Sequence, residues 1–126
     1  MKKNIKRFYT KDSGKRLEFK SGMKRDVEEG KPRFDLIYMP MLKRWAELMA
    51  RGAEKYGEGN WQKAEGEEEL KRFKASAFRH FIQWINDEID EDHASACFFN
   101  VSGAEYVKDK MKNKLDGQRT GSSKKG

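Results

Sequence analysis

Carboxylate side chains give this sequence its clearest chemical potential. Glu47 and Glu54 stand seven residues apart, and residues 86–93 contain five carboxylates within eight positions. Carboxylate oxygens are hard ligands that favour Mg²⁺ or Mn²⁺ over zinc. Such cations commonly bridge carboxylates to substrate phosphates and offset the charge that develops when water attacks phosphorus. The pattern predicts a divalent-metal site, the alternative being a solvated acidic surface. The expected ligands are Glu47, Glu54, Glu88, Glu91 and Asp92.

No other catalytic pattern competes with the carboxylates. The sequence contains no GxxxxGK[ST] or GxGxxG loop, no CxxC pair and no HExxH helix. Its one cysteine, Cys97, falls on an apolar helical face, where a thiol is usually inert. Nucleophilic catalysis is therefore poorly supported, and hydrolysis at a metal ion needs no protein nucleophile.

Periodicity predicts a first helix over residues 39–56, with Glu47 and Glu54 two turns apart along its flank. Pro40 suits the first turn, where a missing N–H costs nothing, and Gly57 suits the left-handed position that ends a helix. Trp61 follows, and it either stacks on a base or belongs to the core. The apolar face expected to be buried consists of Leu42, Trp45, Met49, Ala53 and Tyr56.

A second helix is expected from the acidic cluster at residues 64–69 to about residue 86, and a third from about residue 90 to residue 112. The helix dipole favours negative charge at a helix start, so the cluster needs no catalytic role. His80 is expected as a hydrogen-bonded histidine at the core edge. The apolar face of the second helix is broad, which predicts burial on more than one side. It consists of Phe73, Ala77, Phe78, Phe81, Ile82, Trp84 and Ile85.

The net charge of +7 lies at the two ends of the chain. Residues 1–31 carry +6, residues 32–107 carry −4 and residues 108–126 carry +5. This division predicts an irregular basic arm over residues 1–31, in which segments such as 16–19 pair or dock. It also predicts a helical domain over residues 32–112 and a disordered basic tail over residues 113–126.

The basic ends leave two readings open. Lys31 and Arg33 lie on a segment that Phe34 can anchor, so they are candidates for binding phosphate; the alternative is that they face water. A non-enzymatic, nucleic-acid-binding helical protein is the alternative function, although the acidic middle of the chain argues against nucleic acid. A helical structural protein with a solubilising acidic run is a third possibility.

The number of cysteines and the hydropathy of the sequence indicate the cellular compartment of the protein. A single cysteine rules out an intrachain disulfide framework and fits a reducing, cytoplasmic compartment. No apolar run approaches the ~20 residues that span a bilayer, and the basic start lacks the apolar region of a secretory signal. We therefore expect no membrane partner.

Three stretches carry a resemblance to a known family: FKSGMKRDVEEGKPRFDLI, RWAELMARGAEKYGEGNW and FRHFIQWINDEIDEDHASACFFNVSGAEYV. They resemble the phage dATP/dGTP diphosphohydrolases, the MazZ-type branch of the MazG-like all-α nucleotide pyrophosphohydrolases, over residues 19–107. The most specific parts are Gly52-Ala53-x-Lys55-Tyr56-Gly57-x-x-Asn60-Trp61 and Arg79-His80, followed by the acidic run, His93 and Asn100.

The resemblance implies a MazG-like helical bundle that forms a homo-oligomer, a dimer or a tetramer. It also implies Mg²⁺- or Mn²⁺-dependent cleavage of dGTP or dATP to the monophosphate and pyrophosphate. In some phages the dGMP product feeds synthesis of 2-aminoadenine DNA in the host cytoplasm. The wider group binds metal through an E-x-x-E helix and a later E-x-x-D helix. This sequence departs from both motifs, because Ala50 stands three residues after Glu47 and no strict E-x-x-D is present.

Together, the resemblance and the carboxylates assign expected roles to the remaining residues. The expected catalytic residues are Glu47, Lys55, Arg79 and Glu88. Lys31 and Arg33 are expected to join Lys55 and Arg79 in neutralising phosphates. The residues expected to shape the base pocket or orient ligands are Asn60, Trp61, His80, His93 and Asn100.

Overall fold

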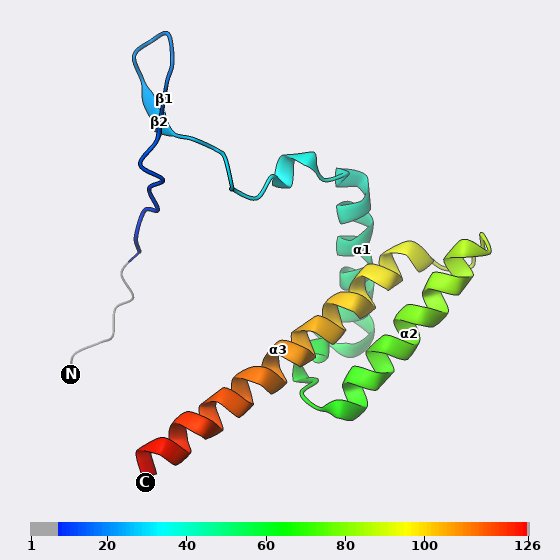
Figure 1. Cartoon of the computed structure of the whole chain (residues 1–126). Helices are drawn as coiled ribbons and strands as arrows, with labels where there is room; N and C mark the ends of the chain where they lie inside the picture. The colour runs from blue at the N-terminus through cyan, green and yellow to red at the C-terminus, as the bar shows by residue number, and fades with distance from the viewer. Residues whose placement is uncertain (1–7, 126) are drawn as a thin grey trace. The chain divides into compact units, whose positions relative to one another are not determined.

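The computed structural model describes the backbone of residues 8–125 and the side chains of residues 8–117. The described chain divides into two compact units, with the boundary between Leu36 and Ile37. The first unit holds a short hairpin, and the second holds three α-helices (Figure 1). The expected all-α bundle with an irregular N-terminal arm is therefore confirmed. None of the described helices is long and apolar enough to cross a membrane.

The first unit contains two short antiparallel strands, β1 (Arg16–Glu18) and β2 (Lys24–Asp26), followed by the 3-10 helix η1 (Phe34–Leu36). Arg16 pairs with Asp26 and Glu18 with Lys24. The N–H of Phe19 donates to the carbonyl of Met23 at 2.9 Å and closes the turn. The pairing expected near residues 16–19 is thus present.

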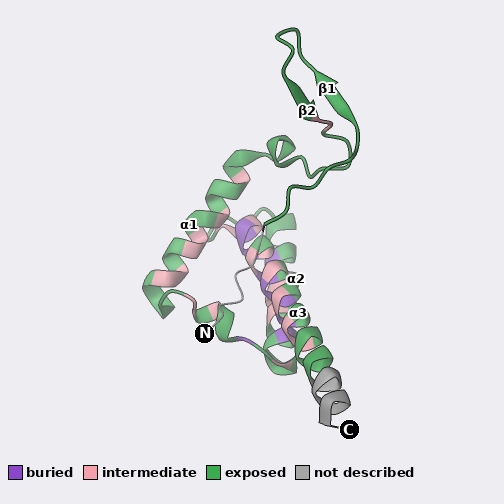
Figure 2. Ribbon diagram, turned by 90° about the vertical axis from the view of Figure 1, so that its left-hand side faces the viewer, coloured by how far each residue is buried: buried purple, intermediate pink, exposed green. Residues whose placement is uncertain are grey.

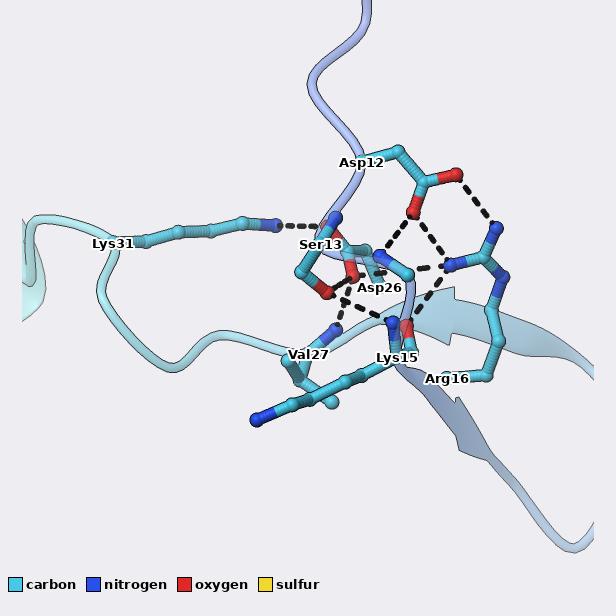
Figure 3. A network of polar contacts seen from close by, with 8 residues as sticks. Asp12, Ser13, Lys15, Arg16, Asp26, Val27 and Lys31 are labelled. Carbon is cyan, nitrogen blue, oxygen red and sulfur yellow. Dashed lines mark hydrogen bonds and ion pairs between the residues drawn. The ribbon is translucent and has the colours of Figure 1, made fainter.

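Polar side chains hold this hairpin, which is too short to build an apolar core (Figure 3). The Asp26 carboxylate accepts hydrogen bonds from the hydroxyl of Ser13, from the N–H of Ser13 at 3.1 Å and from the N–H of Val27 at 3.0 Å. These bonds lower the pKa of Asp26, the Ser13 hydroxyl contributing most. The guanidinium of Arg16 donates two bonds to Asp12, at 2.7 and 2.8 Å, and lowers the pKa of that carboxyl in turn.

The second unit consists of α1 (Met39–Tyr56), α2 (Glu67–Ile85) and α3 (His93–Lys125), with the 3-10 helix η2 (Asn60–Lys63) between α1 and α2. Helices α2 and α3 lie side by side, and α1 packs on α3 (Figure 1). The bounds of α1 agree with the sequence prediction, and those of α2 agree closely.

Helix α3 continues past Lys112 to Lys125 and so includes most of the segment expected to form the basic tail; the disorder expected of residues 113–126 stays a prediction. Residues 113–125 contain no proline, and lysine, leucine, glutamine and arginine among them are good helix formers. The segment after Lys112 lacks the apolar residues that would indicate burial. This lack does not itself end the helix. Gly126 and residues 1–7 of the predicted arm lie outside the described residues.

Local signals set the helix ends as expected. The Glu69 carboxylate accepts the N–H groups of Gly66 at 3.0 Å and of Glu65 at 3.3 Å, so the acidic cluster caps the start of α2. Gly57 ends α1, donating its N–H to the carbonyl of Ala53 at 2.8 Å. Its φ of 91° needs glycine, as expected, although its ψ of 150° is extended and not left-handed helical.

The core is small and lies between α2 and α3, where Figure 2 shows the buried residues. Leu70 of α2 meets Ala104 and Val107 of α3, and Phe73 packs against them. Helix α1 contributes no fully buried residue, and its main helix contact is with α3. Leu42 and Tyr56, expected on its buried face, are 45% and 60% exposed.

Trp45 provides an aromatic contact between α1 and α3. Its ring meets Phe98 of α3 edge-on, with 5.9 Å between the ring centroids. An aromatic contact of this kind contributes about 0.5–1.5 kcal/mol beyond the buried area. Trp45, Met49 and Ala53 are half-buried, so the middle of the predicted face is the part that packs.

Gly103 allows the close approach of α2 and α3. A Cβ at this position would lie 2.5–2.7 Å from the ring of Phe73. Gly103→Ala is therefore expected to destabilise the protein by about 1–3 kcal/mol through overpacking. Gly117→Ala is the control on the same helix, because nothing lies within 4 Å of its Cβ. Urea unfolding followed by circular dichroism measures both, and equal stability of the two variants would contradict the packing described.

Candidate functional site

The loop between α2 and α3 gathers three metal-ligating side chains. Glu88, Asp90 and His93 each offer one ligand atom, and these atoms lie within 4.8 Å of one another. Among the described residues, no other set of three His, Cys, Asp or Glu side chains meets that spacing. We call these three residues the metal group. Two exposed carboxylates and one imidazole fit a divalent cation that keeps open positions for water or substrate.

His93 is the fixed member of the metal group, because it is 2% exposed and bonded at both ring nitrogens. Its Nε2 lies 2.7 Å from Oδ1 of Asp90, and its Nδ1 lies 2.8 Å from Nδ1 of His80. His80 is 7% exposed, as expected for a hydrogen-bonded histidine at the core edge. Burial lowers the pKa of His80, and the charge of Arg79 lowers it further. His80 is therefore a neutral hydrogen-bond partner that orients the ring of His93.

Asp90 and His93 share one proton across their 2.7 Å contact. The hydrogen bond from His93 lowers the pKa of Asp90. A divalent cation at the metal group would take the place of that proton, because metal ligands bind in their deprotonated form. Cation binding at this group is therefore expected to release a proton.

Asp92 joins this loop to α1. The guanidinium of Arg44 donates two hydrogen bonds to its carboxylate, at 2.9 and 2.6 Å. The same carboxylate accepts the N–H of Ser95 at 3.1 Å and caps α3. Arg44 holds the pKa of Asp92 well below its usual range. Both oxygens of Asp92 are thus engaged by groups other than a metal.

Asp92→Asn is expected to cost about 1 kcal/mol at pH 7, because it removes a partly exposed ion pair while leaving a side chain that can cap. The folded-state pKa of Asp92 lies below the unfolded value of ~3.9, so the pair stabilises the fold above that pH. The contribution of this ion pair to the free energy of unfolding decreases as the pH falls below that value. Thermal unfolding from pH 7 to pH 3 measures this, and a difference between the two proteins that grows on acidification would contradict the assignment.

A cavity of about 510 Å³, which we call the α1 cavity, lies at the end of α1. Arg51 and Lys55, one helical turn apart, line it together with Asn60, Trp61 and Glu91. Its volume is within the ~300–1,000 Å³ usual for small-molecule sites. Two cations beside an aromatic ring and an amide suit a ligand that combines phosphates with a base.

Helix α3 holds in place the segment with Trp61 and Gln62, which forms one wall of the α1 cavity. The ring of Trp61 meets Tyr106 edge-on at 4.9 Å between centroids. The hydroxyl of Tyr106 donates to the carbonyl of Gln62 at 2.8 Å, and the ammonium of Lys110 donates to the same oxygen at 2.9 Å. The wall is therefore preformed, and Trp61 both packs on the bundle and lines the cavity.

A second cavity of about 390 Å³, which we call the acidic cavity, contains the loop between α2 and α3. Glu88 and His93 of the metal group line it, together with Arg44 and Asp92. Glu91 lines both this cavity and the α1 cavity. The metal group and the nucleotide-sized cavity therefore lie on the two sides of one exposed carboxylate.

Comparison with protein families gives a match that covers this part of the chain. The family model described as dATP/dGTP diphosphohydrolase, N-terminal, matches residues 21–114. The chain belongs to this family. The match includes the metal group and the whole lining of the α1 cavity, and it confirms the resemblance found in the sequence. The family name indicates a hydrolase that acts on nucleoside triphosphates. Searches of curated proteins and of solved structures returned no match.

The two α1 carboxylates of this diphosphohydrolase family member do not belong to the metal group. Glu47 and Glu54 are exposed on α1 and do not join the three ligands. Glu47 is close enough to Arg44 for its charge to raise the pKa of that guanidinium, an effect for which Asp92 is the main cause. The structure thus brings the flank of α1 that carries Glu47 toward Asp92, whereas among the described residues Glu54 forms no hydrogen bond or ion pair with the loop.

Two more residues expected in the site have ordinary partners in this family member. Arg79 is exposed on α2 and donates to the side-chain oxygen of Gln83 at 3.4 Å. Asn100 is buried, and its amide donates to the carbonyl of Ala96 at 2.8 Å, one turn earlier in α3. Neither lines either of the two cavities.

Lys31 and Arg33 lie in the N-terminal unit. Arg33 donates two hydrogen bonds to Asp35, at 2.8 and 2.7 Å, and Lys31 lies 3.9 Å from Asp26. Both side chains therefore have acidic partners within their own unit. Their role in binding phosphate stays a prediction.

Sequence reasoning missed Asp90, Arg44 and Arg51. The spacing of Asp90 and His93, three residues apart at a helix start, was the available signal for the first. Arg51 and Lys55 stand four residues apart and so share a helix face. No local signal identifies Arg44, because its partner Asp92 lies 48 residues away.

Proposed function

We propose that this chain is a metal-dependent pyrophosphohydrolase that converts dGTP or dATP to the monophosphate and pyrophosphate. One observation carries the proposal: Glu91 lines both the α1 cavity and the acidic cavity, and the acidic cavity is also lined by Glu88 and His93 of the metal group. A triphosphate that fills the cavity would extend its phosphates toward the acidic loop. Family membership supports the choice of a purine deoxynucleotide.

The metal group fits Mn²⁺ or Mg²⁺. Carboxylate oxygens suit both ions, whereas the imidazole of His93 favours Mn²⁺, because Mg²⁺ prefers oxygen ligands. A bound cation supplies positive charge that offsets the charge developing on the phosphate oxygens. Glu91 would bring a further carboxylate from the side of the α1 cavity. Glu47 and Glu54 remain candidate ligands for additional cations.

The α1 cavity supplies the binding groups of the proposed reaction. Arg51 and Lys55 would neutralise the triphosphate, the role expected of Lys55 from sequence. Trp61 offers a ring surface for a purine, and the amide of Asn60 can both donate to and accept from a base edge. His80 and His93 act at the other side of Glu91, where His80 holds His93 in place.

The proposal includes two features of the wider biology. The dGMP product would feed synthesis of 2-aminoadenine DNA in a phage-infected cell, or simply remove dGTP from the nucleotide pool. Association of copies is also expected, because the described core of one chain is small.

Product analysis across the eight common nucleoside triphosphates tests the proposed reaction. With Mn²⁺ present, dGTP and dATP are expected to yield monophosphate and pyrophosphate in equal amounts. Release of orthophosphate with a diphosphate would indicate cleavage at the wrong phosphorus. That result, or no turnover of any triphosphate, would overturn the proposal.

A further inference from the structure

Gly52 stands in the interior of α1, where the packing of the described chain gives no reason for a glycine. A glycine inside a helix lowers stability relative to alanine, because it loses more conformational freedom on folding. Gly103 of α3 has a compensating role, since a Cβ at that position would collide with the ring of Phe73. At Gly52, by contrast, an added Cβ would have no packed neighbour within 4 Å among the described residues. The reason for this glycine therefore lies outside the packing of the helices.

The open space at Gly52 belongs to the α1 cavity. Gly52 lines that cavity, and so do its neighbours on the same side of the helix, one turn before it and one turn after it. These neighbours are Leu48, Met49, Lys55 and Tyr56. Gly52 is half-buried although its Cβ position is empty, as expected at the floor of a concave surface. The glycine thus leaves space at the centre of the helical wall of the cavity.

The chemistry of this wall suits a base and not a phosphate. The N–H and C=O groups in the middle of an α-helix bond to each other, so the backbone at Gly52 offers no free donor to an anion. Met49 and Phe99 add apolar surface to the same cavity. Phosphates have other partners there, the guanidinium of Arg51 and the ammonium of Lys55. A flat ring can lie directly on the backbone of a glycine, whereas a Cβ would hold it away.

We propose that Gly52 is a ligand-contact position, at which the base of the nucleotide lies directly on the backbone of α1. The base then occupies the space that a side chain at residue 52 would fill, and Trp61 offers its ring in the same cavity. The choice of a nucleotide rests on the proposed function. The contact of a flat ring with Gly52 rests on the shape of the cavity and on the empty Cβ position.

Gly52→Ala is expected to change stability and binding in opposite directions. The melting temperature should rise by roughly 2–6 °C, because alanine favours the helix and meets no packed neighbour. The affinity for dGMP should fall by ~10–100-fold, because a close-packed contact tolerates an added methyl group poorly. Scanning calorimetry of the full chain measures the first effect, and isothermal titration with dGMP measures the second. A glycine kept only for the fold would not give this combination.

Gly117→Ala is the matched control. Gly117 is also a helical glycine with nothing within 4 Å of an added Cβ, but it does not line the α1 cavity. Its substitution is expected to leave the affinity for dGMP as in the wild type. Inorganic pyrophosphate has no base, so it is expected to bind Gly52→Ala and the wild type equally. Gly52→Leu keeps a good helix former but fills more of the cavity, and is expected to abolish binding of dGMP.

Four results would overturn the inference. Two of them are a wild type that does not bind dGMP and a Gly52→Ala variant that binds it as the wild type does. An equal loss of dGMP and pyrophosphate binding would place phosphate, not the base, at Gly52. A lower melting temperature of Gly52→Ala would show that another protein segment packs on this glycine.

The inference and the proposed function fail separately. If Gly52→Ala weakens dGMP binding in a protein whose wild type hydrolyses no triphosphate, only the proposed function is refuted. If Gly52→Leu releases pyrophosphate from dGTP with the kcat and KM of the wild type, only the contact at Gly52 is refuted.

Discussion

Glu88→Gln is expected to remove Mn²⁺-dependent release of pyrophosphate, with a fall in kcat of more than ~100-fold. The substitution keeps the size of the side chain but removes the charge of one of three convergent ligands. Changes in the shell around a metal already cost ~10–100-fold, so loss of a direct ligand costs more. Asp90 and His93 stay linked by their hydrogen bond, so the fold itself is expected to survive.

Two measurements separate this effect from a general loss of charge. Glu68→Gln, in the first turn of α2 and outside the metal group, is the matched control and keeps full activity. Mn²⁺ is expected to raise the melting temperature of the wild type and of Glu68→Gln, but not of Glu88→Gln. Full hydrolysis by Glu88→Gln would show that the metal group does not serve the reaction.

Lys55→Met is expected to raise the KM for dGTP by about 10–100-fold. The variant keeps the apolar stem of the side chain but loses the ammonium, which lies 5.1 Å above the ring of Tyr56 at the α1 cavity. A hydrogen bond to a charged group is worth about 1.5–3 kcal/mol, which corresponds to this change in affinity. Binding of Mn²⁺ is expected to stay as in the wild type, because Lys55 is not a member of the metal group.

Lys43→Met provides the matched control for the cavity. Lys43 is also exposed on α1, but it does not line the α1 cavity. Its KM is expected to equal that of the wild type. Equal rises in KM for both variants would indicate long-range attraction of the triphosphate in place of binding within the cavity.

Local signals in the sequence define most of the fold. Pro40 and Gly57 mark the ends of α1 because each acts on the backbone of its own turn. The sequence alone does not fix the end of α3, because helix formation and burial are separate properties and the segment after Lys112 lacks the apolar pattern that marks a buried helix.

The ligands of the candidate site were harder to predict. The sequence shows how many carboxylates there are, but not which of them are already bonded to other side chains in the fold. Asp92 is engaged by Arg44, and that contact exists only once α1 packs beside α3. Asp90 reaches His93 because the two stand three residues apart at the start of α3, a local spacing that the count of carboxylates did not single out. By contrast, Lys55, Asn60 and Trp61 belong to one continuous motif and line one cavity.

The most direct test is a crystal structure with Mn²⁺ and a dGTP analogue that cannot be hydrolysed. Anomalous scattering is expected to place Mn²⁺ between Glu88, Asp90 and His93. The triphosphate should run from there past Glu91 to Lys55, and the base should lie against Trp61. Mn²⁺ bound by Glu47 and Glu54 with no ligand from the loop between α2 and α3 would contradict the account, as would a nucleotide bound outside the α1 cavity.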